Sequence, residues 1–171
     1  MSATAKPQDA IALLKKDHDE VKAMFEEYDG LGDRAFASKK KLADKICLEL
    51  TKHAIAEEEI FYPAVRGAFD ESEDLVDEAT VEHASAKDLI AQISSMDPHD
   101  DLYDAKVKVL GEYIDHHVQE EEEEMFPKAK KADLDMVELG QKIQARKDEI
   151  EMIPPEPMLS AKAGAGTQPR L

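Results

Sequence analysis

The chain has 171 residues, and its 39 Asp and Glu against 22 Lys and Arg give a formal net charge of −17 at pH 7. This length, with 42% hydrophobic residues, suits one compact domain with a single sizeable core. The acidic balance argues against nucleic acid and against anionic membrane surfaces as partners, because both require clustered Lys and Arg.

The beginning of the chain and its cysteine content indicate a cytoplasmic protein. The stretch MSATAKPQDA at residues 1–10 lacks the apolar region of a signal peptide. Cys47 is the single cysteine, so no disulfide or cysteine metal site can form within one chain. No apolar run reaches about 18 residues, the length of a transmembrane helix, so we expect no membrane association.

Apolar residues at helical spacing predict four long helices. The first is expected over about residues 8–28, the second up to about residue 66, the third from about residue 72 to 93, and the fourth over about residues 102–131. Short connections favour antiparallel neighbours. The predicted fold class is therefore all-α, an antiparallel up-down-up-down four-helix bundle with a bundle core over about residues 9–131.

A shorter amphipathic segment follows, and it is predicted as an extra helix over about residues 134–151 that packs back on the bundle. From Pro154 the chain is rich in Pro, Gly, Ala and Ser and has few large apolar groups. Residues 154–171 are therefore predicted to be a disordered tail, and residues 1–153 a single domain.

A repeated motif links the ends of the second and fourth helices. HAIAEEEIFYP at 53–63 and HVQEEEEEMFP at 117–127 align without gaps and share the residue at five of eleven positions. Residues four apart on an α-helix are about 40° apart around the axis and about 6 Å apart along it. His53 and Glu57 can therefore reach one point together, and so can His117 and Glu121.

The two remaining helices each contribute one histidine to this pattern. His18 lies 35 residues before His53, and His83 lies 34 residues before His117, so the chain resembles two copies of a helical hairpin. A bundle would bring one imidazole from each helix to the interior, together with two carboxylates. Imidazole and carboxylate suit iron, manganese or zinc, and two carboxylates suit a pair of divalent ions. The predicted metal ligands are His18, His53, Glu57, His83, His117 and Glu121.

The other glutamates of the two motifs are interpreted as a solvated face. They are Glu58, Glu59, Glu120 and Glu122 to Glu124. His116 also has a glutamate four residues later, but the proline-anchored alignment selects His117 and leaves His116 as a flanking residue. Pro63 and Pro127 each remove a helical amide, so a kink or a helix end is expected at both.

Through His18, His53-x-x-x-Glu57, His83 and His117-x-x-x-Glu121 the chain resembles the haemerythrin-like cation-binding (HHE) family, over about residues 9–131. The resemblance implies a bundle around a non-haem di-iron centre with the two glutamates bridging the irons. Oxygen-carrying haemerythrins have a further histidine four residues after the third-helix histidine, where this chain has Lys87. That departure argues against reversible oxygen carriage. Tyr113, four residues before His117, is either ordinary core or a phenol that reaches the metal pocket.

Two functions follow from this pattern. The first is a di-iron module that binds or reduces a small oxidant such as oxygen, peroxide or nitric oxide, with iron supplying the redox chemistry. The second is an iron or redox sensor, or an iron store, that acts through a protein partner of unknown identity. Enzymatic turnover is left open. A ferritin-like carboxylate oxidase is rejected, because it needs Glu-x-x-His at i, i+3, and this chain has the reverse order with a longer spacing.

Overall fold

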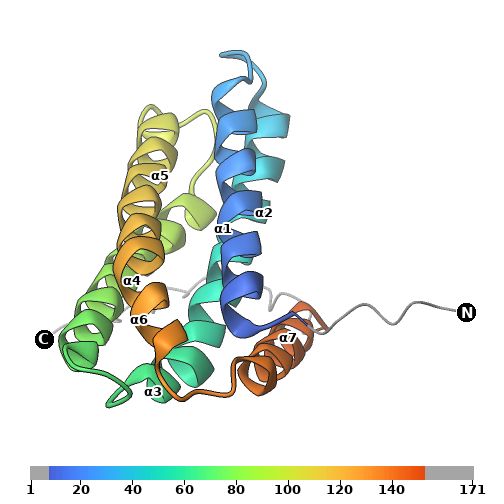
Figure 1. The fold of residues 1–171 in the computed structure, drawn as a ribbon. Helices are drawn as coiled ribbons and strands as arrows, with labels where there is room; N and C mark the ends of the chain where they lie inside the picture. Colours follow the sequence, from blue (N-terminus) through green and yellow to red (C-terminus); the bar gives the residue numbers. More distant parts are fainter. Residues whose placement is uncertain (1–7, 153–171) are drawn as a thin grey trace, which may run out of the picture.

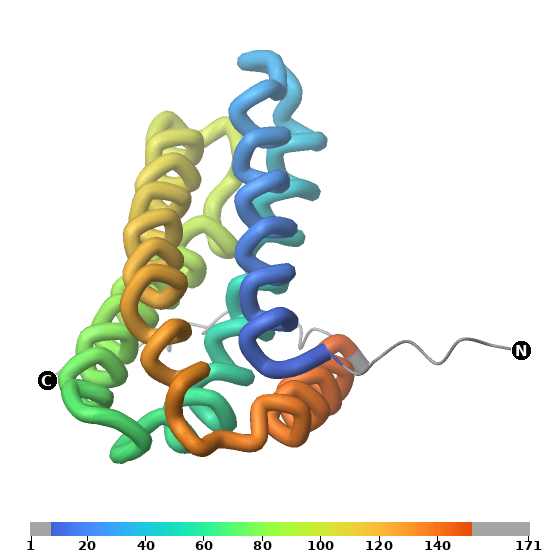
Figure 2. The backbone as a smooth tube through the Cα atoms, in the orientation of Figure 1, coloured from blue at the N-terminus to red at the C-terminus, as the bar shows by residue number. Residues whose placement is uncertain are grey.

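Four antiparallel helices build the bundle in the computed structural model, which describes residues 8–152 (Figures 1 and 2). They are α1 (Ala10–Asp29), α2 (Phe36–Ala56), α4 (Ser72–Ser95) and α5 (Tyr103–Glu120). The chain reverses direction between successive helices, so the order is up-down-up-down and the predicted fold class is confirmed. The carboxylate of Asp9 caps the start of α1 by accepting a hydrogen bond from the amide of Ala12 at 2.8 Å.

The second and fourth helices do not end at their motifs but continue through π-helical turns. η1 (Glu57–Phe61) follows α2 and leads into α3 (Tyr62–Val65), while η2 (Glu121–Met125) follows α5 and leads into α6 (Phe126–Lys131). A π-turn pairs each amide with the carbonyl five residues earlier and is frequent at functional sites. Both turns begin at a glutamate that the sequence singles out as a ligand.

The prolines explain where these turns end. The amide of Tyr62 bonds the carbonyl of Glu57, and the amide of Phe126 bonds that of Glu121, each one residue before a proline that has no amide to donate. The irregularity expected at Pro63 and Pro127 thus takes the form of a π-turn. The chain widens into a π-turn ahead of each proline and stays helical for a short stretch beyond it.

The C-terminal helix α7 (Met136–Met152) agrees with the extra helix expected over 134–151, and it lies across the base of the bundle beside the start of α1 (Figure 2). A Cβ added at Gly140 would sit 2.5 Å from the carbonyl oxygen of Gln8, so glycine permits this close approach. Ile143 of α7 is fully buried in the core. The predicted tail at 154–171 lies outside the described residues, and the domain boundary at 153 stays a prediction.

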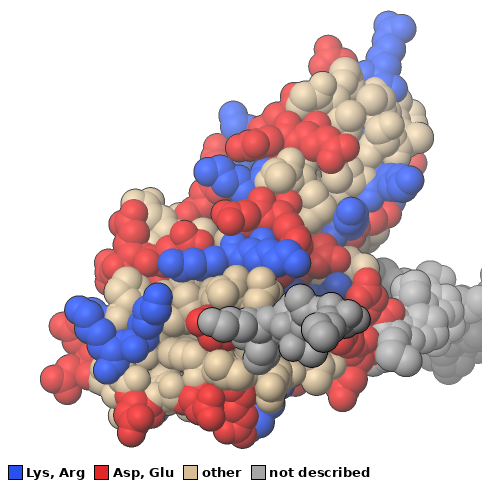
Figure 3. Space-filling view, turned by 45° about the vertical axis from the view of Figure 1, so that its right-hand side comes forward, with Lys and Arg blue, Asp and Glu red and all other residues tan. Residues whose placement is uncertain are grey.

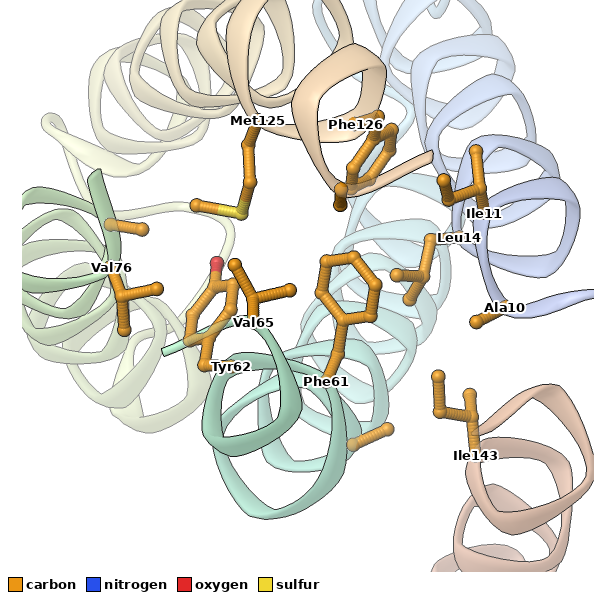
Figure 4. Close-up of a cluster of buried hydrophobic side chains, with 13 residues drawn as sticks. Ala10, Ile11, Leu14, Phe61, Tyr62, Val65, Val76, Met125, Phe126 and Ile143 are labelled. Carbon is orange, nitrogen blue, oxygen red and sulfur yellow. The ribbon is translucent and has the colours of Figure 1, made fainter. Parts of the chain in front are cut away.

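Two apolar clusters fill the bundle and leave a polar layer between them. The lower cluster, drawn in Figure 4, includes Leu14, Phe61 and Met125, and the upper one includes Ile46 and Leu110. In α1, α2 and α4 the ligand-candidate histidine lies between residues of one cluster and residues of the other, and in α5 His117 lies between the upper cluster and Met125 of η2. The histidines therefore share one level of the bundle, walled above and below by apolar side chains.

The surface carries interleaved acidic and basic side chains on the face shown in Figure 3. Tyr113 is 49% exposed on α5, so it is neither a core residue nor part of the polar layer, which corrects both readings of it. Within residues 8–152, none of the helices combines the length and the apolar character that crossing a membrane requires.

Candidate metal centre

The four histidines of the polar layer point their Nε2 atoms at one another in two pairs. Nε2 of His18 lies 3.2 Å from Nε2 of His53, and Nε2 of His83 lies 3.1 Å from Nε2 of His117. All four side chains are buried. Each pair joins two different helices, α1 with α2 and α4 with α5, as the doubled hairpin predicts.

Glu57 connects the two pairs. Its Oε1 lies 3.0 Å from Nε2 of His53, and its Oε2 lies 3.1 Å from Nε2 of His83. Glu121 reaches both sides as well, with Oε1 at 2.6 Å from Nε2 of His117 and 3.7 Å from Nε2 of His18. The structure thus brings together all six residues that the sequence predicts as ligands. Two of the three donor sets with metal-binding geometry among residues 8–152 lie in this buried layer, His18 with His53, Glu57 and Glu121, and Glu57 with His83 and His117. The third, Glu82 with His116 and Glu120, is partly exposed.

A carboxylate faces the Nδ1 atom of every one of these imidazoles. Asp17 lies 2.9 Å from Nδ1 of His53, and Glu122 lies 2.9 Å from Nδ1 of His18. The equivalent pairs in the other half of the bundle are Glu82 with His117 at 2.5 Å and Glu58 with His83 at 3.0 Å. A neutral imidazole held in this way donates from Nδ1 and presents a bare lone pair at Nε2. Four such lone pairs that face inward make a cation site.

These outer carboxylates follow the internal repeat. The acidic residue just before the first histidine of each hairpin, Asp17 or Glu82, serves the second histidine of the same hairpin. The residue just after each ligand-candidate glutamate, Glu58 or Glu122, serves the first histidine of the other hairpin. The prediction of a wholly solvated glutamate face is therefore wrong for Glu58 and Glu122, which orient imidazoles across the bundle.

The buried carboxylate oxygens of the site show whether a metal ion would fit there. Oε1 of Glu57 and both side-chain oxygens of Glu121 are buried and receive no hydrogen bond from the described part of the chain. Nε2 of His53 and Nε2 of His117 lie 3.0 and 2.6 Å from the two Oε1 atoms but form no hydrogen bond with them, so the buried charge is only partly compensated. Uncompensated buried charge costs several kcal/mol in real proteins. Divalent ions placed between these oxygens and the Nε2 atoms would satisfy both. The donor set of imidazole and carboxylate is one that iron, manganese and zinc accept.

The electrostatics of the metal-free site differ between the two glutamates. Burial works against ionisation of Glu57, but His53 and His83 outweigh it and hold its pKa well below the usual value. Burial and the neighbouring charge of Glu57 raise the pKa of Glu121 to about 7. The difference arises because Glu57 lies between two imidazoles at hydrogen-bond distance, whereas Glu121 has one and faces Glu57.

The pKa values of the histidines also differ within the site. Burial opposes the charged form of His53, but Glu57 and Asp17 outweigh it and raise the pKa to about 10. His117 behaves alike, since Glu121 and Glu82 overcome burial and raise its pKa to about 11. Burial and the adjacent His53 lower the pKa of His18 to about 4. Protons on His53 and His117 thus neutralise part of the buried negative charge, and metal ions would have to displace them.

Tyr62 is a member of the site that sequence analysis missed. Its phenolic oxygen lies 3.2 Å from Oε2 of Glu57, 3.2 Å from Nε2 of His83 and 3.4 Å from Nε2 of His117. Burial and the charges of Glu121 and Glu57 hold the pKa of this phenol well above its usual value. The residue at the same place in the second motif is Phe126, which has no hydroxyl, so besides the shared Glu57 the phenol reaches only the histidines of the set with His83 and His117. That set is the one that lacks a second carboxylate.

The remaining candidates lie around the edge of the centre. His116 is exposed and lies 3.2 Å from Glu120 and 3.5 Å from Glu82, outside the buried layer, as expected for a flanking residue. Lys87 is also largely exposed, and it donates hydrogen bonds of 2.7 and 2.5 Å to Glu58, the carboxylate that holds His83. The lysine at the position of the additional haemerythrin histidine therefore contacts the centre through a carboxylate.

Fold and site together define a helical-bundle cation-binding protein. The family model described as Hemerythrin HHE cation binding domain matches residues 9–129, which is most of the chain. The chain belongs to this family, and its recognition from the motif residues is confirmed. The match ends before α7, so the helix that crosses the base of the bundle lies outside it.

Two individual proteins are similar to the chain. A crystal structure of a Hemerythrin HHE cation binding domain-containing protein, the Rv2633c homolog from Mycobacterium kansasii, superposes with a TM-score of 0.70 at 23% identity and covers 84% of this chain and 87% of that one. This likeness supports the fold. A protein from Nostoc sp. strain PCC 7120 named DNA nickase is 30% identical over 114 residues, which are 67% of this chain. The chain spans only 31% of that protein's length.

Proposed function

We propose that the chain binds two iron ions at the six residues of the polar layer and that it binds or reduces a small oxidant such as oxygen, peroxide or nitric oxide. The family supports cation binding, and the two donor sets that share Glu57 support a pair of ions. Iron, when bound, would supply the electrons and the open coordination position that such oxidants require. His18, His53, Glu57 and Glu121 would hold one ion, and Glu57, His83 and His117 the other, with Tyr62 beside it.

A small cavity beside the four histidines supports the oxidant part of the proposal. It has a volume of about 30 Å³ and is lined by all four ligand-candidate histidines. Its other walls are mostly aliphatic and include Leu50, Ala86, Ile90 and Ile114. A single water needs about 10–15 Å³ measured in this way. The space thus has room for a molecule of about two heavy atoms.

The protein's own groups have three tasks in this proposal. The outer carboxylates fix the imidazoles in the Nδ1–H tautomer, so that the lone pairs of Nε2 face the metal ions. The aliphatic walls keep bulk water away from the reacting molecule. The phenol of Tyr62 can donate a hydrogen bond into the centre, next to Glu57 and His83.

Anaerobic loading with Fe²⁺ tests the proposal. Oxygen, hydrogen peroxide and nitric oxide would be added separately, and absorption spectra and oxidant consumption would be recorded. We expect a spectral change with at least one of them in the native protein and none in His53→Ala. A metal-loaded protein that reacts with none of the three would contradict the oxidant role while leaving cation binding intact.

A matched pair of substitutions on α4 tests the cavity. Ala86→Leu would fill it from one wall, whereas Ala84→Leu adds the same group at an exposed position on the same helix. We expect both variants to hold as much iron as the native protein. Oxidant reaction should be strongly slowed by Ala86→Leu alone, and equal rates would remove the cavity from the proposal.

The second candidate function is an iron or redox sensor. It is favoured by α7, which lies outside the matched family region and still contacts the centre through Lys147. Repeated turnover separates the candidates, since a sensor or store would react once per bound ion and an enzyme many times.

DNA nicking, as named for the Nostoc relative, is not carried over to this chain, because the net charge of −17 opposes phosphate-backbone binding. A cytoplasmic location belongs to the same proposal.

A further inference from the structure

Lys147 is a lysine of α7 whose ammonium group is directed into the bundle. The residue is 8% exposed, and its Nζ donates to Oδ1 of Asp17 on α1 at 2.5 Å. Asp17 is buried too, at 8% exposure. A buried lysine is rare unless it is paired, and this pair joins the C-terminal helix to the first helix of the bundle.

The same carboxylate holds a ligand-candidate histidine. Oδ2 of Asp17 accepts the Nδ1 proton of His53 at 2.9 Å, so Asp17 has a donor at each oxygen. A carboxylate fixed at both oxygens has one orientation, and that orientation sets the direction of the His53 ring. Without Lys147, the ionised carboxylate would keep one buried donor and would turn toward water to find another. That rotation removes the acceptor from His53.

The other half of the bundle contains an exposed counterpart. Lys87 donates to Glu58, and Glu58 accepts from Nδ1 of His83 at 3.0 Å. The Lys87 side chain is 45% exposed, against 10% for that of Lys147. Water can replace an exposed ammonium group as a donor, and salt screens its charge, so Lys87 should matter less.

We propose that Lys147 is a positioning residue of the metal centre, which holds Asp17 and thereby the Nε2 atom of His53 in place, so that α7 forms part of the metal site. The inference rests on cation binding at the proposed centre and does not depend on any reaction with oxidants. A positioning role and a purely electrostatic role of Lys147 predict opposite changes in cation affinity when the lysine is replaced. Removal of a nearby positive charge alone would strengthen cation binding, whereas loss of His53 orientation weakens it.

Zn²⁺ affinity, measured by competition with a chelating dye, tests the proposal on full-length variants. Lys147→Met keeps the apolar stem and should weaken the tighter-bound Zn²⁺ by about tenfold or more, the range seen when an outer partner of a metal ligand is lost. Lys147→Arg should restore affinity. The control is Arg146→Met, which removes an ion pair from α7 to Glu59 but touches no carboxylate that holds a histidine. This variant should stay near the native affinity, and Lys87→Met, the exposed counterpart, should weaken binding less than Lys147→Met does.

A spectroscopic readout separates positioning from helix docking. In the diamagnetic Zn²⁺ form, the Nδ1 proton of His53 should give a slowly exchanging NMR signal that disappears in Lys147→Met and persists in Arg146→Met. Equal affinities and equal signals in these two variants would reduce Lys147 to a docking role and overturn the proposal. Tighter Zn²⁺ binding by Lys147→Met would overturn it as well.

The native protein provides a test that does not depend on folding of the variants. The buried ammonium of Lys147 should give an NMR signal that shifts on addition of Zn²⁺, while Lys142, an exposed lysine of the same helix, should show no change. If the Lys147 signal does not shift in protein that has bound Zn²⁺, the positioning role of Lys147 is overturned, while the proposed metal binding stands. Failure of the native protein to bind Zn²⁺ or iron would overturn it together with the proposed function.

Discussion

The phenolic oxygen of Tyr62 donates a hydrogen bond to Oε2 of Glu57 at 3.2 Å, although the two residues are five apart in the chain. Residues five apart on a regular α-helix lie about 140° apart around the axis. The π-turn η1 reduces this offset, because it pairs each amide with the carbonyl five positions earlier. Tyr62 therefore faces the same interior as Glu57, and its counterpart Phe126 brings an apolar ring against His18 instead.

Tyr62→Phe tests whether the phenol binds metal. The change copies the residue of the second motif and leaves the ring in the core. If the phenolate coordinates Fe³⁺, as its distances to Glu57 and His83 favour, the native ferric protein should show a visible charge-transfer band that the variant lacks. Absorption spectra of the two proteins at equal iron content decide this. An unchanged visible spectrum would restrict Tyr62 to hydrogen bonding.

Adjacent residues in the glutamate-rich motif provide matched tests of the ligand assignment. His117→Ala should lose most bound iron, because His117 lies in the buried layer, whereas His116→Ala should retain it. Likewise, Glu121→Gln should lower the metal content, and Glu123→Gln, at an exposed position, should leave it unchanged. Metal analysis of purified proteins checks all four. Equal losses within a pair would mean that the motif binds cations diffusely.

The two central glutamates should affect the metal-free protein in opposite directions. The folded-state pKa of Glu121 is raised to about 7, so the stability contributed by its protonated form is complete below about 4.5 and is lost as pH rises through 7. Glu121→Gln should therefore stabilise the metal-free protein at pH 8, by roughly 1–3 kcal/mol. The pKa of Glu57 is lowered, so its contribution is present above about 4.5 and is lost as pH falls further.

Glu57→Gln should accordingly destabilise the metal-free protein at neutral pH. Denaturant unfolding of chelator-treated protein at pH 4.5 and pH 8 measures both effects. The gain from Glu121→Gln should be absent at the lower pH. A change of the same sign for both variants at pH 8 would contradict the asymmetric electrostatics of the site.

Metal binding should also stabilise the bundle as a whole, since ligands from four helices are tied together. Hydrogen exchange on metal-free and metal-loaded protein should show protection that rises together around His18, His53, His83 and His117. The increase in thermal unfolding midpoint should be largest near pH 10 and should shrink as pH falls below the pKa values of about 10 for His53 and about 11 for His117, because metal ions must then displace their protons. A response confined to residues 116–127 would indicate a local acidic site in place of a shared centre.

The parts of the site that follow α-helical periodicity could be predicted from the sequence, and the others could not. His53 and Glu57 are four apart and face one way on any α-helix. Tyr62 was missed because nothing in the sequence signalled the π-turn. Glu58 was assigned to a solvated face because its partner, His83, is on another helix, and only the packing of the bundle places them together. The nearest sequence signal is the acidic residue just before the first histidine of each hairpin, Asp17 before His18 and Glu82 before His83.

Lys147 lay beyond prediction for a related reason. The periodicity of the C-terminal segment indicated a helix with an apolar face, and Ile143 is indeed buried. It did not reveal which bundle helix that face would meet or that a lysine beside it would meet Asp17. Such contacts depend on the angle at which α7 crosses the base, and this angle is set by packing that includes the close approach at Gly140.

An anaerobic titration with Fe²⁺, followed by metal analysis after removal of free ions, tests the central claim that residues of all four helices form one centre for two ions. The account predicts saturation at two irons per chain in the native protein and a loss of bound iron in both His53→Ala and His117→Ala, which alter different hairpins. Saturation at one iron, or full retention of two irons by either variant, would contradict it.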